Sequence, residues 1–228
     1  MARILGRVLW TQSSGDLMET NVVIQGDCLE VMRGMEDNSA DLVVTDPPYG
    51  IGESGKKNRS RGTKTNPKDY GDYDWDHSPA SDEQITEMIR VSKNQIIFGG
   101  NFFNLPPSPC WLVWDKDNGA CDFADCELAW TSFKTAVRKF KWRWHGFLQE
   151  NMKRKEFRSH PTQKPVPLMK WIIESYSKPG DLIIDPFAGS GSTGVGCRDL
   201  GRRYILIEQD PKYVKICNER LKQEVLAL

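Results

Sequence analysis

Short apolar runs alternate with amphipathic segments along most of this chain. The apolar runs predict buried strands that begin at Val22 and cover 41–46, 95–98, 111–114, 181–185 and 203–208. Segments with an apolar stripe or a helix-start signal predict helices over 29–35, 81–91, 165–177, 192–200 and 211–225. Because strands and helices alternate, we expect an α/β fold with a doubly wound, mostly parallel sheet that is covered by helices on both faces.

The polar segment 50–76 interrupts this alternation. It is rich in glycine, lysine, arginine and asparagine, and a loop of this length is usually functional or disordered. Its basic side chains follow a strand directly, so they are candidates for phosphate contacts and for closing over a substrate. These candidates are Lys56, Lys57, Arg59 and Arg61. The alternative, which we favour for the ligand-free chain, is a solvated, flexible insertion.

A second stretch, 120–159, combines basic residues with aromatic rings, most densely from Phe140 to Phe147. Basic side chains can neutralise phosphates, and planar rings can stack on bases or wedge beside them. We therefore predict a small DNA-contact insertion here, with five basic candidates: Lys139, Arg143, Lys153, Arg154 and Lys155. The competing interpretation is a hairpin whose tryptophans pack inward while its charges face solvent.

Length and composition favour one soluble domain. The 228 residues, 39% of them hydrophobic, suffice for a single core, so we expect a leader over 1–20 and one domain over 21–228. The 31 basic and 31 acidic side chains cancel, so a nucleic acid would have to bind local basic patches. No run approaches the ~18 apolar residues of a membrane span. We expect a cytoplasmic protein without a membrane partner; monomer and homodimer both stay open.

The six cysteines do not form a metal-ligand pattern. No pair has CxxC spacing, and the neighbouring Cys121 and Cys126 have no matching second pair or closely spaced histidines. We therefore expect free, mostly buried thiols and no metal site.

The strand predicted at 41–46 runs into Asp46-Pro47-Pro48-Tyr49. Neither proline can donate to a sheet ladder, so the strand ends here and leaves Asp46 and Tyr49 at its carboxyl end, where open α/β sheets bind ligands. A carboxylate, proline carbonyls and an aromatic ring offer acceptors and a stacking face to a planar group that carries an NH₂. We interpret that group as the exocyclic amine of a nucleobase. The alternative is a simple Pro-Pro turn.

A glycine-rich turn, Asp185-Pro186-Phe187-Ala188-Gly189-Ser190-Gly191, follows the strand at 181–185. Its glycines let the backbone turn sharply and approach a ligand closely. Glu208 ends the next strand about 20 positions after Gly189, the spacing at which an acidic residue binds ribose hydroxyls. The pair predicts an adenosine-containing cofactor. Gly194 also completes the spacing of a dinucleotide site, but Asp46-Pro47-Pro48-Tyr49 has no evident role in hydride transfer.

Three separated motifs together resemble those of amino-group DNA methyltransferases that use S-adenosylmethionine. They are Asp46-Pro47-Pro48-Tyr49, the turn from Asp185 to Gly191, and His160-Pro161-Thr162-Gln163-Lys164-Pro165. Their order, with the catalytic motif first and the cofactor turn last, is similar to that of the permuted β group. The resemblance covers roughly residues 21–221. It implies a Rossmann-like methyltransferase fold with a circularly permuted motif order, a DNA substrate and S-adenosylmethionine as cofactor.

The resemblance also implies which residues hold the cofactor. Asp27 and Cys28 would lie along its adenine, and Thr162 and Lys164 near its methionine end. The remaining candidates are Asp185, Phe187, Ala188, Gly189, Ser190, Gly191 and Glu208. Asp27 has a second interpretation as the N-cap of the helix that follows it.

The target atom suggests a mechanism. An exocyclic amine is a poor nucleophile because its lone pair is delocalised into the ring. Asp46 and the Pro47 carbonyl would accept its two hydrogens, and Tyr49 would stack on the base, which must be flipped out of the duplex. Asp rather than Ser at position 46 resembles adenine-N6 enzymes.

Cytosine-N4 methylation is the first alternative to this assignment. An inactive nucleic-acid-binding module of the same fold is another. Methylation of RNA or of a protein glutamine is a third, although those families usually place the cofactor turn before the catalytic motif.

Overall fold

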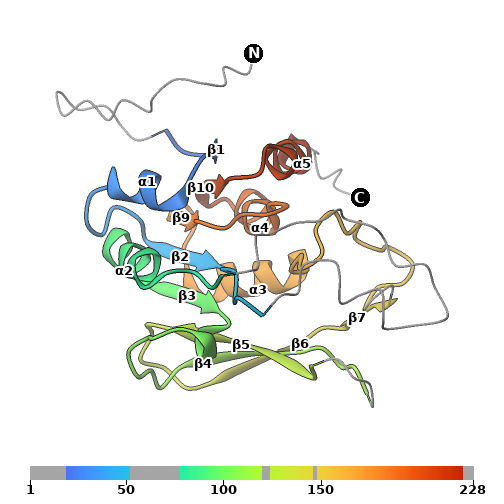
Figure 1. Ribbon diagram of the computed structural model, residues 1–228. Helices are drawn as coiled ribbons and strands as arrows, with labels where there is room; N and C mark the ends of the chain where they lie inside the picture. Colours follow the sequence, from blue (N-terminus) through green and yellow to red (C-terminus); the bar gives the residue numbers. More distant parts are fainter. Residues whose placement is uncertain (1–18, 52–77, 120–123, 146–147, 223–228) are drawn as a thin grey trace.

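The computed structural model describes residues 19–51, 78–119, 124–145 and 148–222. Within these ranges, eight strands form one sheet in the order β1-β10-β9-β2-β3-β5-β4-β6 (Figure 1). Their bounds are β1 Val22–Gln25, β2 Leu42–Thr45, β3 Gln95–Phe98, β4 Trp111–Asp115, β5 Cys126–Thr131, β6 Arg138–Lys141, β9 Leu182–Asp185 and β10 Arg203–Glu208. A separate two-stranded ribbon consists of β7 (Trp144–His145) and β8 (Leu148–Gln149).

Most strands of the sheet run in the same direction. β1, β10, β9, β2 and β3 pair in parallel, whereas β5 is antiparallel to both β3 and β4, and β6 pairs in parallel with β4. Parallel neighbours need crossover connections, which the helices supply. The predicted α/β class with a mostly parallel, doubly wound sheet is confirmed.

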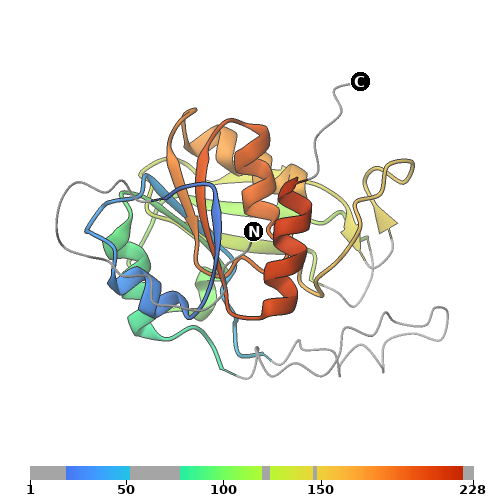
Figure 2. The same ribbon diagram turned by 90° about the horizontal axis from the view of Figure 1, so that it is seen from above.

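Helices cover both faces of the sheet (Figures 1 and 2). One face carries α1 (Cys28–Arg33) and α2 (Asp82–Val91), and the other carries α3 (Val166–Tyr176), α4 (Ser192–Asp199) and α5 (Pro211–Lys222). The predicted capping box begins α2: the Ser81 hydroxyl accepts the Gln84 N–H, and the Gln84 side chain accepts the Ser81 N–H.

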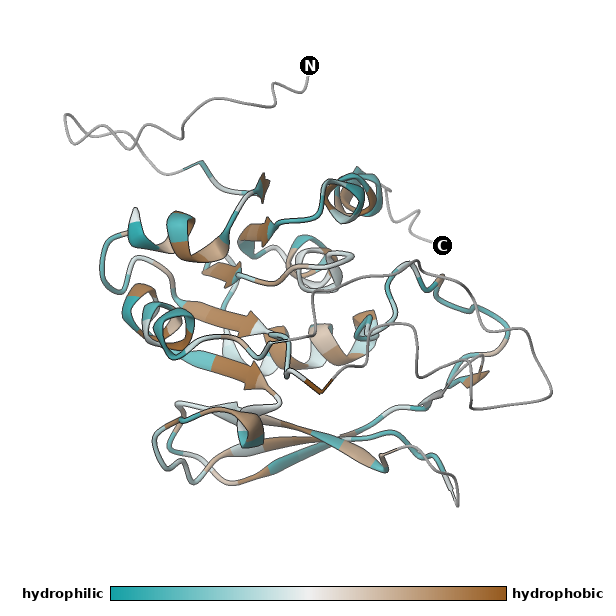
Figure 3. Ribbon diagram, in the orientation of Figure 1, coloured by the Kyte–Doolittle hydropathy of each residue, from teal (hydrophilic) through white to brown (hydrophobic). Residues whose placement is uncertain are grey.

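The strands contribute side chains to two hydrophobic cores, one on each face of the sheet. All four residues of β2 are buried; Val43 packs in the cluster that includes α1 and α2, whereas Leu42 and Val44 pack in the cluster that includes α3. Alternate side chains of a strand point to opposite faces, so a parallel strand buried on both faces reads as a continuous apolar run. Figure 3 shows these strands in brown, between helices that carry both hydrophilic and hydrophobic residues.

The sequence patterns missed one strand in the interior of the sheet. β5 lies between β3 and β4, and β6 forms the edge beside β4, so both belong to the main sheet. The prediction of an insertion over 120–159 is wrong for these two strands. The physical reason is that only Ala129, Trp130 and Thr131 of β5 are buried, a run too short to signal a buried strand.

The aromatic rings of the basic segment pack inward. Phe140 stacks on Trp171 of α3, with ring centroids 5.1 Å apart, and on Trp142 at 6.1 Å. Trp144 is buried, and the Arg158 guanidinium lies 5.5 Å from its ring centroid. Burying such large rings stabilises the core. The prediction that they stack on bases is therefore wrong, and the inward-packed interpretation is confirmed for these rings.

Other predictions concern features outside or at the margins of the described residues. Residues 1–18 of the predicted leader, 52–76 of the predicted loop, and Cys121 lie outside them. Within the described ranges, no helix has the length and apolar character needed to cross a membrane. The same ranges contain no cluster of three or more side chains suited to a metal ion. Four cysteines are free and buried and Cys126 is exposed; the buried ones are Cys28, Cys110, Cys197 and Cys217.

A glycine turn after β3 holds the ring of Tyr49. Gly99 has a φ of 63°, and a Cβ atom at this position would overlap the Tyr49 ring. At Gly100, a Cβ atom would meet the side chain of Trp130. The short 3₁₀ helix η2 (Gly100–Phe102) follows directly. Glycine is required here because the backbone approaches an aromatic ring closely.

We predict that Gly99→Ala lowers the melting temperature by more than Gly201→Ala. Both glycines have positive φ, 63° and 69°, so both substitutions incur a backbone cost of about 1–2 kcal/mol. Nothing lies within 4 Å of a Cβ at Gly201, so only Gly99→Ala adds an overpacking cost of about 1–3 kcal/mol. Thermal unfolding followed by circular dichroism measures the difference. Equal losses would contradict the close packing against Tyr49.

Candidate functional site

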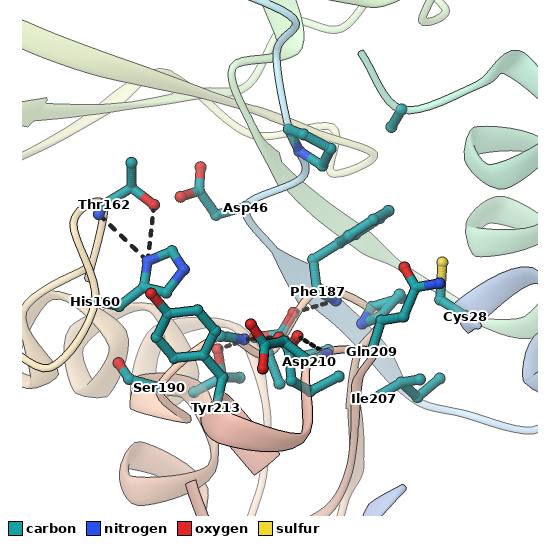
Figure 4. A pocket seen from close by; sticks show the side chains of 18 of the residues that line it. Cys28, Asp46, His160, Thr162, Phe187, Ser190, Ile207, Gln209, Asp210 and Tyr213 are labelled. Carbon is teal, nitrogen blue, oxygen red and sulfur yellow. Dashed lines mark hydrogen bonds between the residues drawn. The ribbon is translucent and has the colours of Figure 1, made fainter. Parts of the chain in front are cut away.

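A cavity of about 480 Å³ opens at the carboxyl ends of β2, β9 and β10 (Figure 4). Its walls come from the turns after β1, β2, β9 and β10, from the segment before α3, and from the start of α5. This size and position are typical of a small-molecule site in an open α/β sheet.

Two of the predicted motifs meet at this cavity. β2 and β9 are neighbours in the sheet, so Asp46, which follows β2, and Asp185, which ends β9, reach the same edge. The Thr45 hydroxyl donates a hydrogen bond of 2.8 Å to the Asp185 carboxylate, across 140 positions of sequence. Asp46 and Pro48 therefore line the same cavity as the glycine-rich turn.

Asp185 holds the glycine-rich turn in place. Its carboxylate accepts hydrogen bonds from the hydroxyls of Thr45 and Thr193, at 2.8 and 2.6 Å, and from the Phe187 N–H at 3.1 Å. Burial raises the pKa of Asp185 to about 6, although these donors oppose the rise. Asp185 also lines the cavity, so it both fixes the shape of the turn through these three donors and stays a candidate for contact with a cofactor.

Glu208 presents a carboxylate to the cavity. Its Oε2 accepts the Gly189 N–H and its Oε1 accepts the Asp210 N–H, both at 2.8 Å. Burial raises the pKa of Glu208 to about 7, against the lowering effect of these backbone donors. A carboxylate fixed in this way keeps lone pairs that suit hydroxyl donors, such as those of a ribose.

The turn itself divides into lining and shaping residues. Phe187, Ala188, Gly189 and Ser190 line the cavity, but Gly191 does not. Gly191 stands at the N-cap of α4 with a φ of 79°, and a Cβ atom there would collide with the Cys217 thiol. Its glycine therefore serves the backbone path into α4 and close packing against α5.

Asp27 and Cys28 line the cavity beside the turn after β1. The Asp27 carboxylate also accepts the N–H groups of Leu29 and Glu30, at 2.8 and 3.1 Å, which caps α1. The N-cap interpretation is thus confirmed, and it does not remove Asp27 from the cavity. The Gln84 side chain donates to the Cys28 sulfur at 3.4 Å and completes this wall.

Asp46 is held by two side chains. Its carboxylate forms an ion pair with Lys164 and accepts a hydrogen bond from the Tyr49 hydroxyl. The Tyr49 ring stacks on Phe102 with centroids 5.0 Å apart and planes 14° apart. Pro47 and Tyr49 are absent from the residues that line this cavity, whereas Asp46 and Pro48 are present.

The segment before α3 closes one side of the cavity. His160, Thr162 and Lys164 all line it. The His160 ring accepts the Thr162 N–H at 3.3 Å and packs edge-on against Tyr213, with ring centroids 4.3 Å apart. Burial lowers the pKa of His160 to about 3, so the ring is neutral at physiological pH.

Several lining residues escaped the sequence analysis. Gln84, Gln209, Asp210 and Tyr213 contribute to the cavity, and Figure 4 shows the last three on the side of β10 and α5. The signal for Gln209 and Asp210 was available, because they follow Glu208 at the carboxyl end of a predicted strand. No sequence pattern identified Gln84 or Tyr213, which reach the cavity from helices.

The predicted DNA-contact residues divide into two sets. Lys139 pairs with Asp115 at 3.3 Å, and Arg143 pairs with Asp117. The side chains of Lys153, Arg154 and Lys155 are exposed on the segment that leads to His160, and those of Lys139 and Arg143 are exposed as well, at 64% and 47%. The other candidates, Lys56, Lys57, Arg59 and Arg61, lie outside the described residues.

Fold and cavity together form a ligand site of the open α/β type. The mostly parallel sheet carries an antiparallel strand near one edge, and one cavity joins a glycine-rich turn to an Asp-Pro-Pro-Tyr strand end.

Comparisons with known proteins identify the family. Residues 111–219 match the family model of N6 and N4 DNA methylases. The Escherichia coli K12 protein YubD, whose name describes a methylase, is 31% identical over 220 residues, which cover 87% of this chain and 88% of YubD. The chain therefore belongs to the DNA methylase family, whose members methylate amino groups and depend on S-adenosylmethionine. This confirms the resemblance seen in the three motifs.

Two solved structures share the fold. The complex of M1.HpyAVI with S-adenosylmethionine has a TM-score of 0.51 at 22% identity, and the match covers 88% of this chain and 98% of that one. The cytosine-N4-specific PvuII DNA methyltransferase has a TM-score of 0.55 at 17% identity, with 90% and 87% covered.

We predict that ionisation of Glu208 destabilises the ligand-free protein as the pH rises from about 5 to 7. The pKa of Glu208 rises from 4.5 to about 7 on folding, so the folded state binds the proton more tightly and loses this advantage through that window. Glu208→Gln removes the titration, and the melting temperature should then fall less steeply with pH. Glu174→Gln, which neutralises an exposed carboxylate on α3, is the matched control. An unchanged slope in Glu208→Gln would contradict the assignment.

Proposed function

We propose that this protein transfers a methyl group from S-adenosylmethionine to the N6 amine of an adenine flipped out of DNA. Membership of the DNA methylase family accounts for methyl transfer to DNA. The observation that carries the finer proposal is the single cavity in which Asp46 and Pro48 lie beside the glycine-rich turn and Glu208. The acceptor for an amine and the site for an adenosine cofactor are thereby adjacent.

The cavity fits S-adenosylmethionine in size and chemistry. In Figure 4, Cys28 and Ile207 lie toward one end and His160 and Thr162 toward the other, with Phe187 between them. We assign the adenine to the end with Cys28, Ile207 and Asp27, as the family motifs imply. Bound there, the cofactor would supply an activated methyl group. M1.HpyAVI, which has the same fold, is described in complex with S-adenosylmethionine.

Other parts of the cofactor have partners of matching chemistry. We assign the ribose hydroxyls to Glu208, whose carboxylate is already oriented by two backbone N–H groups. We assign the methionine end to Thr162 and to the turn residues Ala188, Gly189 and Ser190, because they line the cavity near His160. Hydroxyl and backbone groups suit an amino-acid moiety that carries both an ammonium and a carboxylate.

We assign Asp46 the role of accepting a hydrogen of the target amine. Burial raises the pKa of Asp46, the charge of Glu127 adds to the rise, and Lys164 opposes it. A more basic carboxylate is a stronger acceptor, so it interacts most strongly with the amine as positive charge develops there. We assign the second amine hydrogen to the Pro47 carbonyl.

Tyr49 is assigned as the aromatic wall for the flipped base. Its hydroxyl donates to Asp46, and its ring is anchored by Phe102 at 5.0 Å and by Phe103 at 6.2 Å. A ring fixed in this way orients a planar base relative to the acceptor. The base must leave the duplex first, at a cost of a few kcal/mol.

Cytosine-N4 methylation is the second candidate. PvuII DNA methyltransferase, which is cytosine-N4-specific, shares the fold, and cytosine presents the same amino group on a ring carbon. We favour adenine because Asp at position 46, rather than Ser, resembles adenine-N6 enzymes.

We predict that DNA incubated with the purified protein and S-adenosylmethionine gains N6-methyladenine and no N4-methylcytosine. Asp46→Ala should reduce the transfer rate by about 10²–10⁴-fold, since it removes the acceptor for the amine. The affinity for S-adenosylmethionine should stay within about twofold, because Asp46 faces the target base. Sequencing that detects both modified bases, together with calorimetric titration of the cofactor, measures these outcomes.

Three results would overturn parts of this proposal. N4-methylcytosine alone would replace the adenine assignment by the cytosine one. DNA binding without any methyl transfer would support the alternative of an inactive nucleic-acid-binding module. Loss of cofactor binding in Asp46→Ala would refute the role assigned to Asp46. Glu208→Ala is the complementary control, and we expect it to weaken binding of the cofactor but not binding of DNA.

We further predict that neutralising 153–155 reduces the salt dependence of DNA binding. The slope of log K against log salt changes by about 0.9 for each phosphate that the protein no longer neutralises, so Lys153→Gln/Arg154→Gln/Lys155→Gln should lower it by up to about 3. The control replaces three exposed lysines elsewhere, Lys178, Lys215 and Lys222, and should keep the wild-type slope. Fluorescence anisotropy across a salt series provides the measurement; equal slopes for both triple variants would place the DNA elsewhere.

A further inference from the structure

A chain of alternating charges leads from the edge half of the sheet to Asp46. Lys164 forms an ion pair with Asp46, and its Nζ lies 3.1 Å from Oε2 of Glu127. The other carboxylate oxygen of Glu127 pairs with Lys116 of the loop after β4. The order Lys116, Glu127, Lys164, Asp46 thus places each charge beside one of opposite sign.

This arrangement is shielded from water. The Lys164 side chain is only 8% exposed, and those of Asp46 and Glu127 are 20% and 25% exposed. Lys164 also lies 5.0 Å from the centroid of the Phe98 ring. Charges in such surroundings interact more strongly than at an open surface, so each neighbour affects how the next one behaves.

Glu127 belongs to none of the motifs in the sequence. It lies on β5, which is separated from β2 by β3, and so it reaches Lys164 from a strand that carries no part of the cavity. Folding alone brings it to the ammonium that also holds Asp46.

We propose that Glu127 is a positioning residue for methyl transfer: by sharing the Lys164 ammonium, it keeps Asp46 from being that cation's sole counter-ion. This inference rests on the proposed function of Asp46. With Glu127 in place, the Lys164 charge is divided between two carboxylates, and Asp46 keeps acceptor strength for the target amine. Without Glu127, Lys164 would hold Asp46 more firmly and weaken it as an acceptor.

The titration behaviour of these groups is consistent with this role. Burial by itself would raise the pKa of Glu127, but Lys164 and Lys116 outweigh it and lower the pKa to about 2, so Glu127 is charged at physiological pH. The groups that face Asp46 are the Tyr49 hydroxyl, Lys164, Glu127 and, from β9, Asp185. Of these, Glu127 acts on Asp46 both through space and through Lys164.

Two substitutions should shift the acid limb of the pH profile of kcat in opposite directions. Glu127→Gln keeps the shape but removes the charge, so the pKa of Asp46 falls and the acid limb of the kcat profile moves to lower pH. Lys116→Gln leaves Glu127 with Lys164 as its cation, which draws Lys164 from Asp46 and moves the acid limb to higher pH.

The expected kinetic effect separates positioning from binding. Glu127→Gln should lower kcat by about 10- to 100-fold through misplacement and weakening of the acceptor. The KM for S-adenosylmethionine should change by less than about twofold. Steady-state methylation of duplex DNA between pH 5.5 and 9 measures both quantities. Glu87→Gln, which breaks a partly buried ion pair with Arg90 on α2, is the matched control and should keep the wild-type profile.

Opposite shifts of the two acid limbs support the inference. The inference would be overturned if Glu127→Gln kept the wild-type kcat and the wild-type acid limb. It would also be overturned if the acid limbs of both variants moved in the same direction, because a merely structural role would cause such a common shift. If Glu127→Gln does not fold, Lys116→Gln alone decides: an upward shift supports the inference and an unchanged profile refutes it. Absence of methylation by the wild-type protein would instead refute the proposed function.

Discussion

The parallel pairing of β2 with β9 is the constraint on which the whole site depends. Their register aligns Leu42 with Ile183 and Val43 with Ile184, so both strands end at one edge of the sheet. The hydrogen bond from Thr45 to Asp185 joins the two ends. A slip of one residue would turn the alternating side chains to the wrong faces, so burial on both faces fixes the register. Two motifs far apart in sequence thus become one site through backbone pairing.

At this edge the fold buries charge that does not serve stability. The carboxyls of Asp185 and Glu208 have pKa values raised to about 6 and about 7 because they are buried, so their ionisation at neutral pH weakens the ligand-free fold. Replacing buried charges by apolar groups often stabilises a protein. Their presence here is explained by what they hold: Asp185 fixes the turn, and Glu208 offers acceptors to a ligand. Stability is thereby exchanged for a preorganised site.

The structural features that depend on short, local sequence patterns could be predicted from the sequence. The parallel strands other than β6, the capping box of α2 and both carboxyl-end motifs follow from short runs of residues, so they could be predicted. β5 was missed, because Glu127 interrupts its apolar residues and its place in the sheet depends on antiparallel pairing with β3 and β4. The contact of Glu127 with Lys164 depends on the order of strands in the sheet, and the inward packing of Phe140 depends on α3. Such contacts between distant elements leave no local signature.

The segment that carries the exposed basic residues is connected to the cavity by hydrogen bonds that are partly or fully buried. Glu156 accepts from the side chains of Gln163 and Arg220, each at 2.8 Å, and Arg220 also donates to the Ser190 carbonyl at 2.7 Å. The Ser190 hydroxyl in turn donates to Gln163 at 3.1 Å. Since these bonds connect the basic segment, the lead-in to α3 and the glycine-rich turn, the three are joined into one packed unit. Under the proposed function, the distance between a phosphate bound at 153–155 and the cavity would therefore be set by folding, and only the flipped base would have to move.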